Sequence, residues 1–245
     1  MTPDWVYPYL AVFLRVSGCI MLLPAIGGNF TPVRARIMIC LMLTLIIAPV
    51  VYEGLQAALN SGRSTFGIMA GEFLFGIVLG ALVRLIAYAA SFAGGMITSL
   101  IGLTNVFSMN IEHNESAPIL ETFLGLATTA LIFSTDTHLL MVVAIRKSYD
   151  FYAATQDISA QIFLVEVVDA VRKSATIAMH IAAPFLILTV VANFAVAILN
   201  RLVQQVPMYF VMNGPIVLVG FVLMGLVADR ALGLVVAALI EELAR

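Results

Sequence analysis

The sequence predicts an all-α membrane protein made of several apolar helices, and three observations support this prediction. Hydrophobic residues make up 62% of the 245 residues and charged residues 11%, where soluble proteins have about 45–50% and about 25%. The mean hydropathy is +1.07. A soluble domain of this size has too little interior to bury so much apolar surface. The same composition, with a net charge of −2, excludes a nucleic-acid binder, a disordered chain and a secreted disulfide scaffold.

About six hydrophobic segments follow one another, because about 20 apolar residues in a helix cross a hydrocarbon core of about 30 Å. They comprise residues 5–24, 37–52, 65–111, 118–145, 174–200 and 202–228. Prolines lie within or at the ends of these segments, at positions 24, 32, 49, 184, 207 and 215. Each proline removes a helix hydrogen bond, so we expect kinked helical hairpins that pack against neighbours rather than straight spans.

The first segment is apolar except for Arg15. An ionisable side chain inside a bilayer costs about 2.5–3.5 kcal/mol, so Arg15 requires an explanation. It is expected either to pair with a carboxylate or with free carbonyls of a broken helix, or to lie near the helix end and reach the interface. The second segment follows a Gly/Pro turn closed by Arg34 and Arg36. These arginines, with Arg201 near the C-terminus, are expected to be structural charges.

The third segment carries four residues spaced by four, which lie on one ridge of a helix: Glu72, Gly76, Gly80 and Arg84. The two glycines form a small-residue groove that admits another backbone. Glu72 and Arg84 are about 18 Å apart along a helix and cannot pair with each other. We expect the ridge to pack against another subunit of an oligomer. The alternative is packing within one chain, with both charges near the interface or satisfied internally.

A loop without Lys or Arg, Asn105 to Ala117, separates the third segment from the fourth. The fourth segment contains five consecutive polar residues, Ser134 to His138. Asp136 and His138 are residue types that occur in intramembrane proton relays. Five polar residues in a row nevertheless favour a turn between two half-length helices.

Residues 146–173 have mixed charges and are predicted to form an amphipathic helix at the membrane face. The last two apolar segments hold no charged residue. Within the first of them, His180 is expected to be a hydrogen-bonded core residue. Cys19 and Cys40 lie in apolar stretches and are expected to be buried thiols rather than a disulfide or a metal pair.

Sequence motifs of enzymes are missing from the chain. It has no H-E-x-x-H, no G-x-S-x-G, no P-loop and no zinc-spaced Cys/His set. Three histidines and two cysteines offer few groups for acid–base or nucleophilic chemistry. We therefore expect a protein that is not an enzyme and that uses no cofactor or metal.

Landmark residues occur in three groups along the chain. The N-terminal landmarks are Phe13, Arg15, Ser17, Gly18, Pro24, Pro32, Arg34, Arg36 and Pro49. The third segment contributes Gly71, Glu72, Gly76, Gly80, Arg84, Ala93 and Gly94. The C-terminal landmarks are Arg201, Gln205, Gly214 and Pro215. In their order and spacing, over nearly the whole chain, these landmarks resemble the FliR family of flagellar biosynthetic export-gate proteins.

This resemblance implies a structural subunit of the flagellar type III protein export gate in the bacterial inner membrane, at the flagellar basal body. Its implied partners are homologues of FliP and FliQ in a helical assembly around a pore, beside homologues of FlhB and FlhA. Unfolded exported proteins would be transient partners, lipid would surround the assembly, and no nucleic acid would bind. Residues 1–173 would be the FliP-like part and residues 174–245 a FliQ-like helical hairpin.

The resemblance also implies that the loop Asn105 to Ala117 is the plug that closes the pore at rest. Its apolar residues are Val106, Phe107, Met109 and Ile111. Flexible Met and aromatic side chains seal against one another and still yield to a passing polypeptide. Three alternatives stay open: a type III virulence secretion gate subunit, a membrane scaffold without a pore, and a small-molecule or ion carrier that uses Asp136, His138 and Arg84. The plain alternative for the loop is a surface loop.

Overall fold

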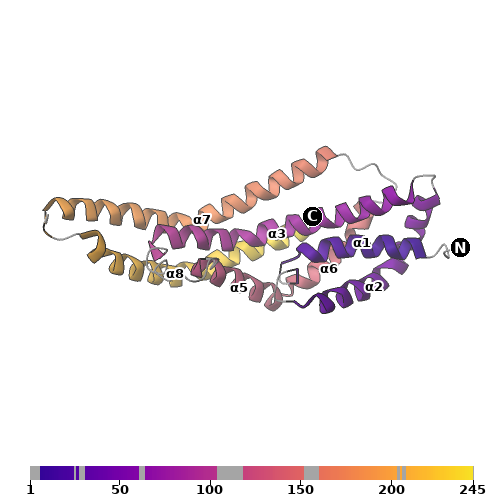
Figure 1. The fold of residues 1–245 in the computed structure, drawn as a ribbon, viewed down its shortest axis with the longest axis horizontal. Coiled ribbons are helices and arrows are strands. Elements are labelled where there is room, and N and C mark those ends of the chain that lie inside the picture. The colour runs from indigo at the N-terminus through magenta and orange to yellow at the C-terminus, as the bar shows by residue number, and fades with distance from the viewer. Residues whose placement is uncertain are drawn as a thin grey trace. The chain divides into compact units, whose positions relative to one another are not determined.

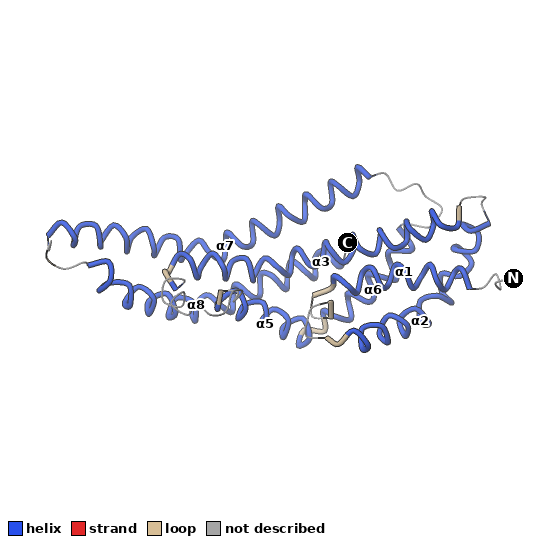
Figure 2. Tube along the Cα trace, viewed as in Figure 1, coloured by secondary structure: helices blue, strands red, loops and turns tan. Residues whose placement is uncertain are grey.

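The computed structural model of the chain describes residues 6–24, 26–27, 31–60, 64–103, 118–151, 160–202, 205 and 208–244. Within these ranges every regular element is an α-helix (Figure 1). Figure 2 colours the described helices blue and the described loops and turns tan. The all-α prediction is confirmed.

Contacts divide the chain into two units, each assembled from separate parts of the sequence. Unit 1 comprises Met1–Ile86, Ile132–Arg172 and Leu239–Arg245, and unit 2 comprises Ala87–Leu131 and Lys173–Ala238. Helices α3 (Thr65–Leu100), α7 (Ala160–Leu202) and α8 (Met208–Ala244) each contribute to both units. The division into FliP-like and FliQ-like parts concerns likeness to other proteins, and it stays a prediction.

Unit 1 is built on four helices: α1 (Val6–Leu22), α2 (Val33–Asn60), the first part of α3 (Thr65–Leu100) and α6 (Thr137–Phe151). Helix α2 begins directly after Pro32, where a residue without an N–H leaves no hydrogen bond unmade. The backbone carbonyl of Ser64 accepts a hydrogen bond from Ile68 at 3.1 Å and starts α3. Buried apolar side chains on these helices, such as Val16 on α1 and Ile86 on α3, form the core.

Unit 2 contains most of α5 (Ile119–Ser134), the second part of α3, and long parts of α7 (Ala160–Leu202) and α8 (Met208–Ala244). Helices α7 and α8 form a hairpin, drawn in orange to yellow in Figure 1. The backbone N–H of Met208 donates to Asn200 Oδ1 at 3.1 Å and closes this hairpin. Leu124 from α5 and Phe185 from α7 are fully buried in the core of unit 2.

Four described helices, α2, α3, α7 and α8, are long and apolar enough to cross a membrane, and the bent pair α5–α6 makes a fifth if it is one span. Helix α1 has 17 residues and a length of about 26 Å, which is short for a core of about 30 Å. Each of the six predicted segments corresponds to a helix or a helix pair. The prediction of a polytopic helical membrane protein is confirmed.

The predicted turn at Ser134 to His138 is confirmed. Helix α5 ends at Ser134, α6 begins at Thr137, and the two helices are bent by 74°. Asp136 has a φ of 54° and is exposed, and Nδ1 of His138 lies 3.5 Å from the carbonyl oxygen of Ile132. A short polar side chain in the left-handed region suits a turn.

The prolines of the apolar segments lie within continuous helices: α2, α7 and α8 run through Pro49, Pro184 and Pro215. The bend of 74° lies between α5 and α6, at a turn that contains no proline. One expectation about a histidine is wrong. His180 is exposed rather than part of the core. The stretch 146–173, predicted as one amphipathic helix, is shared by the end of α6 and the beginning of α7.

Candidate functional site

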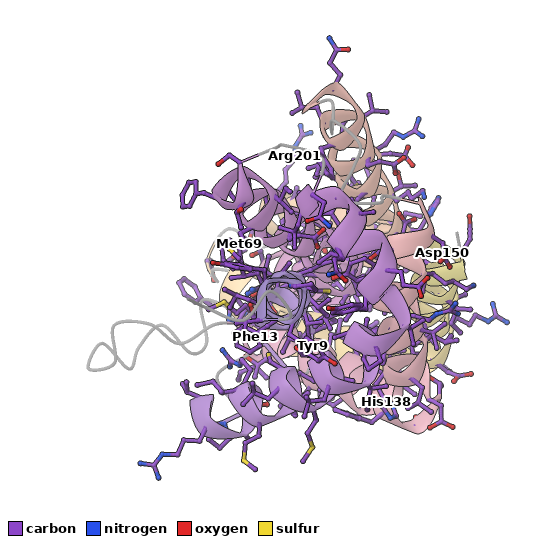
Figure 3. All side chains as sticks on the ribbon, turned by 90° about the vertical axis from the view of Figure 1, so that its right-hand side faces the viewer. Tyr9, Phe13, Met69, His138, Asp150 and Arg201 are labelled. Carbon is purple, nitrogen blue, oxygen red and sulfur yellow. The ribbon has the colours of Figure 1, made fainter. Side chains whose placement is uncertain are left out.

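The most costly buried charges of unit 1 meet between α1 and α3. Arg15 and Glu72 are 57 residues apart in the sequence and form a two-pronged ion pair. Nε of Arg15 donates to Oε2 of Glu72 at 2.6 Å, and Nη2 donates to Oε1 at 2.9 Å. Both side chains are 2% exposed. Figure 3 looks along α1, on which Tyr9 and Phe13 are labelled, and shows the side chains crowded around this helix.

Helix α6 completes the surroundings of the ion pair. Nη1 of Arg15 donates to Oγ of Ser148 at 3.1 Å, and the hydroxyl of Tyr149 donates to Oε2 of Glu72 at 3.4 Å. The guanidinium carbon lies 3.7 Å from the centre of the Tyr149 ring and 4.5 Å from the centre of the Phe75 ring. We call these five residues, Arg15, Glu72, Phe75, Ser148 and Tyr149, the Arg15 cluster. The positive charge of Arg15 is balanced by the negative charge of Glu72, and each guanidinium nitrogen has a hydrogen-bond partner. The two charged side chains can therefore be buried.

Glycines on both helices bring α1 close enough to α3 for this pairing. A side chain at Gly76 would collide with the backbone of Arg15 itself, and one at Gly80 would come within 2.5 Å of the Cys19 carbonyl oxygen. On α1, a side chain at Gly18 would meet the Phe73 carbonyl oxygen at 2.7 Å. Small residues therefore let the two backbones touch, and Glu72, one turn before Gly76, is placed beside Arg15.

For Arg15, pairing with a carboxylate is the alternative that the structure bears out. Glu72 finds its partner in the same chain. Gly76 and Gly80 also serve packing within the chain, which was the alternative to subunit packing. Arg84 is half-buried and lies outside the Arg15 cluster. The role of this ridge in contacts between subunits stays a prediction.

The other predicted charges lie at helix ends. Arg34 is exposed in the first turn of α2, and Nη2 of Arg36 donates to the Thr31 carbonyl oxygen at 3.4 Å. Arg201 is exposed in the last turn of α7. The predicted plug residues Val106, Phe107, Met109 and Ile111, with the whole loop from Asn105 to Ala117, lie outside the described residues.

Sequence reasoning missed Phe75, Ser148 and Tyr149. Ser148 and Tyr149 stand among charged residues at the start of the stretch predicted as a surface helix, which obscured their burial. A helical pattern nevertheless runs through Met141, Ile145, Ser148 and Tyr149, all buried, at spacings of four and three. That pattern could have assigned this part of α6 to the core.

The Arg15 cluster joins three helices through paired charges and offers no exposed reactive group. Cys19 and Cys40 are free and buried, as expected. In the described ranges no group of three or more His, Cys, Asp or Glu side chains is placed to hold a metal ion. The arrangement suits a fixed connection between helices rather than a site that binds and releases a ligand.

Known proteins resemble this chain over nearly its whole length. Residues 6–242 match the family model of bacterial export proteins, family 1. The flagellar biosynthetic protein FliR of Caulobacter vibrioides is 30% identical over 90% of this chain and 88% of its own length. FliR of Escherichia coli is 24% identical over 90% of this chain and 84% of its own. The secretion system apparatus protein SsaT of Salmonella typhimurium is 22% identical over 84% of this chain and 81% of its own.

Proposed function

We propose, from the premise that the chain belongs to the bacterial export proteins of family 1, that it is a structural subunit of the flagellar type III protein export gate. With homologues of FliP and FliQ it would form a channel that passes unfolded flagellar proteins across the bacterial inner membrane. It would act without catalysis and without a cofactor. The observation that carries this proposal is the family match, which extends over residues 6–242.

The relatives favour the flagellar system over a virulence system. The flagellar relative from Caulobacter vibrioides is 30% identical to this chain, whereas the secretion system apparatus protein SsaT is 22% identical. A carrier with Asp136 and His138 as coupling residues is less well supported, because Asp136 lies exposed in a turn. Dispersed charges also argue against a carrier, whose coupling residues converge at one site.

Partner subunits are expected to cover part of the apolar surface. Large apolar side chains are strongly exposed on α2 and α8, among them Ile46 at 68%, Phe210 at 78% and Leu226 at 73%. Extended apolar surface of this kind marks contacts with lipid or with other proteins. We propose homologues of FliP and FliQ as direct neighbours, with homologues of FlhB and FlhA beside them and lipid over the rest.

The four residues of the ridge on α3 have different surroundings. Gly76 and Gly80 hold α1 against α3, and Glu72 pairs with Arg15, so these three residues shape the subunit itself. Arg84 lies farther along α3 and is half-buried. We propose Arg84 as the member of the ridge that contacts a sister subunit.

The loop Asn105 to Ala117 is proposed as the plug of the resting pore, with Val106, Phe107, Met109 and Ile111 as its stoppers. Met side chains have three rotatable bonds and adapt to irregular gaps. A constriction of apolar side chains also blocks ions by excluding water. Such a seal yields to a passing polypeptide because it offers no strong binding site.

Two measurements test the proposed function. Purification of the tagged chain from membranes in mild detergent, followed by mass spectrometry, is expected to recover homologues of FliP and FliQ. Recovery of the chain alone, as a well-behaved monomer, would contradict the subunit assignment. Deletion of residues 107–111 is expected to leave the complex assembled and to raise its ion conductance in planar bilayers. Unchanged conductance would contradict the plug assignment.

A further inference from the structure

Unit 1 contains a cavity beside the Arg15 cluster. It has a volume of about 280 Å³ and is partly open to the outside, which places it near the lower end of the range of about 300–1,000 Å³ for ligand pockets. Phe75 and Ser148, two members of the Arg15 cluster, form part of its wall. Helices α1, α3, α6, α7 and α8 supply the rest, and all of the lining residues belong to unit 1. The cavity is therefore a feature of this unit by itself.

The floor of the cavity is apolar. Its buried apolar side chains come from α1, α3, α6 and α8, and they are Cys19, Leu23, Phe75, Val83, Met141 and Ile145, with Leu243 beside them. Water needs several polar partners to occupy a cavity, so an apolar cavity does not hold it well. An empty cavity loses packing contacts along its whole lining. The floor therefore favours an apolar occupant.

Three charged side chains surround the mouth of the cavity. Lys147 on α6 and Glu166 on α7 are exposed, and Glu242 on α8 is half-buried. Each of them lies within three residues of one end of a candidate membrane span. A span ends where the hydrocarbon core meets the polar headgroups. The mouth is therefore placed at the depth of the lipid headgroups, and the floor lies beside it in the apolar interior of unit 1.

The charges at the mouth have both signs, and this composition matches a zwitterionic headgroup. The ammonium group of Lys147 can bind a phosphate, and the carboxylates of Glu166 and Glu242 can accept hydrogen bonds from an ammonium group. A phosphoethanolamine headgroup carries one phosphate and one ammonium group with three N–H donors, like that of lysine. A phosphocholine headgroup has no N–H donor, and a phosphoglycerol headgroup brings no positive charge to the two carboxylates.

The size of the cavity favours a lipid chain over a helix of another protein. One turn of a helix, about 10 Å wide and 5.4 Å long, fills about 420 Å³, which is more than the cavity of about 280 Å³ can take. A hydrocarbon chain is narrower and flexible, so it can follow an irregular floor. Lipid chains also surround any membrane protein, so an occupant of this kind is always at hand.

We propose that this cavity is a binding site for a phospholipid with a phosphoethanolamine headgroup. One acyl chain fills the apolar floor, the phosphate lies at Lys147, and the ammonium group lies between Glu166 and Glu242. The chain packs against Phe75 and Ser148 and thereby keeps water away from the Arg15 cluster. The inference does not depend on protein export, because it requires only that the chain lies in a membrane.

The test uses phospholipids that carry a photoactivatable diazirine near the end of one acyl chain. Liposomes contain the full chain, purified with the subunits that accompany it, and a labelled lipid with a phosphoethanolamine, phosphocholine or phosphoglycerol headgroup. Mass spectrometry then locates the cross-links. Met141 is 2% exposed, so an acyl chain reaches it only through the cavity, whereas Ile46 on α2 is 68% exposed and reports ordinary contact with the bilayer.

The phosphoethanolamine lipid is expected to label Met141 about tenfold more than the phosphoglycerol lipid does. Tenfold is the factor by which a hydrogen bond to a charged group shifts an equilibrium. Labelling of Ile46 is expected to be the same for all three headgroups, because the surrounding bilayer does not distinguish them there.

Variants at the mouth have matched controls next to them in the sequence. Lys147→Gln and Glu242→Gln each remove one charge from the mouth, and each is expected to lower labelling of Met141 by the phosphoethanolamine lipid about tenfold. Arg146→Gln and Glu241→Gln remove the same charges from residues that do not line the cavity. Both controls are expected to label like the wild type.

A variant of the floor tests the place of the acyl chain. Ala144 lines the cavity, so Ala144→Phe fills part of it, and Ala144→Leu does the same with a smaller side chain. Both changes are expected to lower labelling of Met141 by every headgroup. Val143, which is 44% exposed and does not line the cavity, gives the control Val143→Phe, which is expected to leave labelling unchanged.

Three results would overturn the inference. Equal labelling of Met141 by all three headgroups would show that the mouth does not recognise the headgroup. Equal labelling by the phosphoethanolamine and phosphocholine lipids alone would show that the N–H donors are not recognised. Labelling of Ile46 without any labelling of Met141 would show that protein rather than lipid closes the cavity. A preference for phosphoethanolamine that is lost in the mouth variants and kept in their controls supports the site.

Discussion

Removing one partner of the buried ion pair between Arg15 and Glu72 is expected to be among the most damaging changes to this chain. Arg15→Met leaves the Glu72 carboxylate buried with only the Tyr149 hydroxyl at 3.4 Å. Breaking a buried pair in this way costs about 3–5 kcal/mol. The contact of the guanidinium with two aromatic rings, worth about 0.5–2 kcal/mol, is lost in addition. Against a total stability of about 5–15 kcal/mol, this is a large fraction.

A double-mutant cycle separates the electrostatic contribution of the ion pair to stability from the contribution of the volume that its side chains fill. Glu72→Leu alone leaves the Arg15 guanidinium buried without its carboxylate partner. This change is expected to cost about as much stability as Arg15→Met, again about 3–5 kcal/mol. The double variant Arg15→Met with Glu72→Leu removes both charges and keeps apolar bulk. Because well-packed apolar replacements of buried pairs are often neutral or stabilising, the double variant is expected to be more stable than either single variant.

An exposed ion pair of equal length provides the control. Nη2 of Arg172 lies 2.6 Å from Oδ1 of Asp169, the same distance as between Arg15 and Glu72, but the Arg172 side chain is 76% exposed. Exposed pairs contribute about 0–1 kcal/mol, so Arg172→Met is expected to change stability by less than about 1 kcal/mol. The comparison holds the separation constant and varies burial.

Unfolding of the purified chain in detergent, titrated with SDS, measures these free energies. Labelling of the Cys19 thiol in intact membranes, in a Cys40→Ala chain, gives a second measure, because Cys19 is 3% exposed and lies against Gly80 of α3. If the costs of the two single changes add up in the double variant within about 0.5 kcal/mol, as they do for independent sites, Arg15 and Glu72 are not coupled. A cost of Arg15→Met as small as that of Arg172→Met would also refute the stabilising role of the buried pair.

Three further predictions use other contacts. Gly76→Leu is expected to separate α1 from α3 and to lower strongly the midpoint of unfolding in SDS, whereas Gly71→Leu is expected to leave it unchanged because nothing lies within 4 Å of an added Cβ. Equal effects of the two changes would refute the backbone contact. Asp136→Val is expected to cost about 1–2 kcal/mol because a branched residue resists the left-handed region, and Asp136→Gly, measured in the same titration, is expected to cost nothing. The Cys19 and Cys40 thiols, both buried, are expected to resist maleimide in native membranes and to react fully in SDS; rapid labelling of Cys19 in the native membrane would contradict its packing against α3.

Local patterns predicted much of the fold, because they depend on neighbours in the sequence. Uninterrupted apolar stretches gave the helices, and five polar residues in a row gave the turn around Asp136. The helices continue through Pro49, Pro184 and Pro215, since a helix tolerates the loss of one hydrogen bond, and the kinks expected there stay a prediction. The prediction for His180 was wrong because an apolar neighbourhood in sequence does not say which face of a helix points inward.

Only part of the Arg15 cluster could be predicted from the sequence. The cost of burying charge identified Arg15 and Glu72 as residues that need partners, and the four-residue spacing identified Gly76 as a place of close approach. No local pattern connects Arg15 with Glu72, which is 57 residues away, or with Ser148 on α6. That connection depends on which helices meet, and the meeting is decided by packing over the whole of unit 1.

The discontinuous make-up of unit 1 has a consequence for biosynthesis. Residues 239–245 belong to the same unit as α1, and Leu239 and Leu243 are buried there. Domains generally fold in the order in which the ribosome releases them, beginning at the N-terminus. Helix α1 and the other early helices of unit 1 therefore cannot complete their core until residues 239–245 have been translated, after α7 and most of α8. Until then, the apolar surfaces of these helices need to be protected from other contacts.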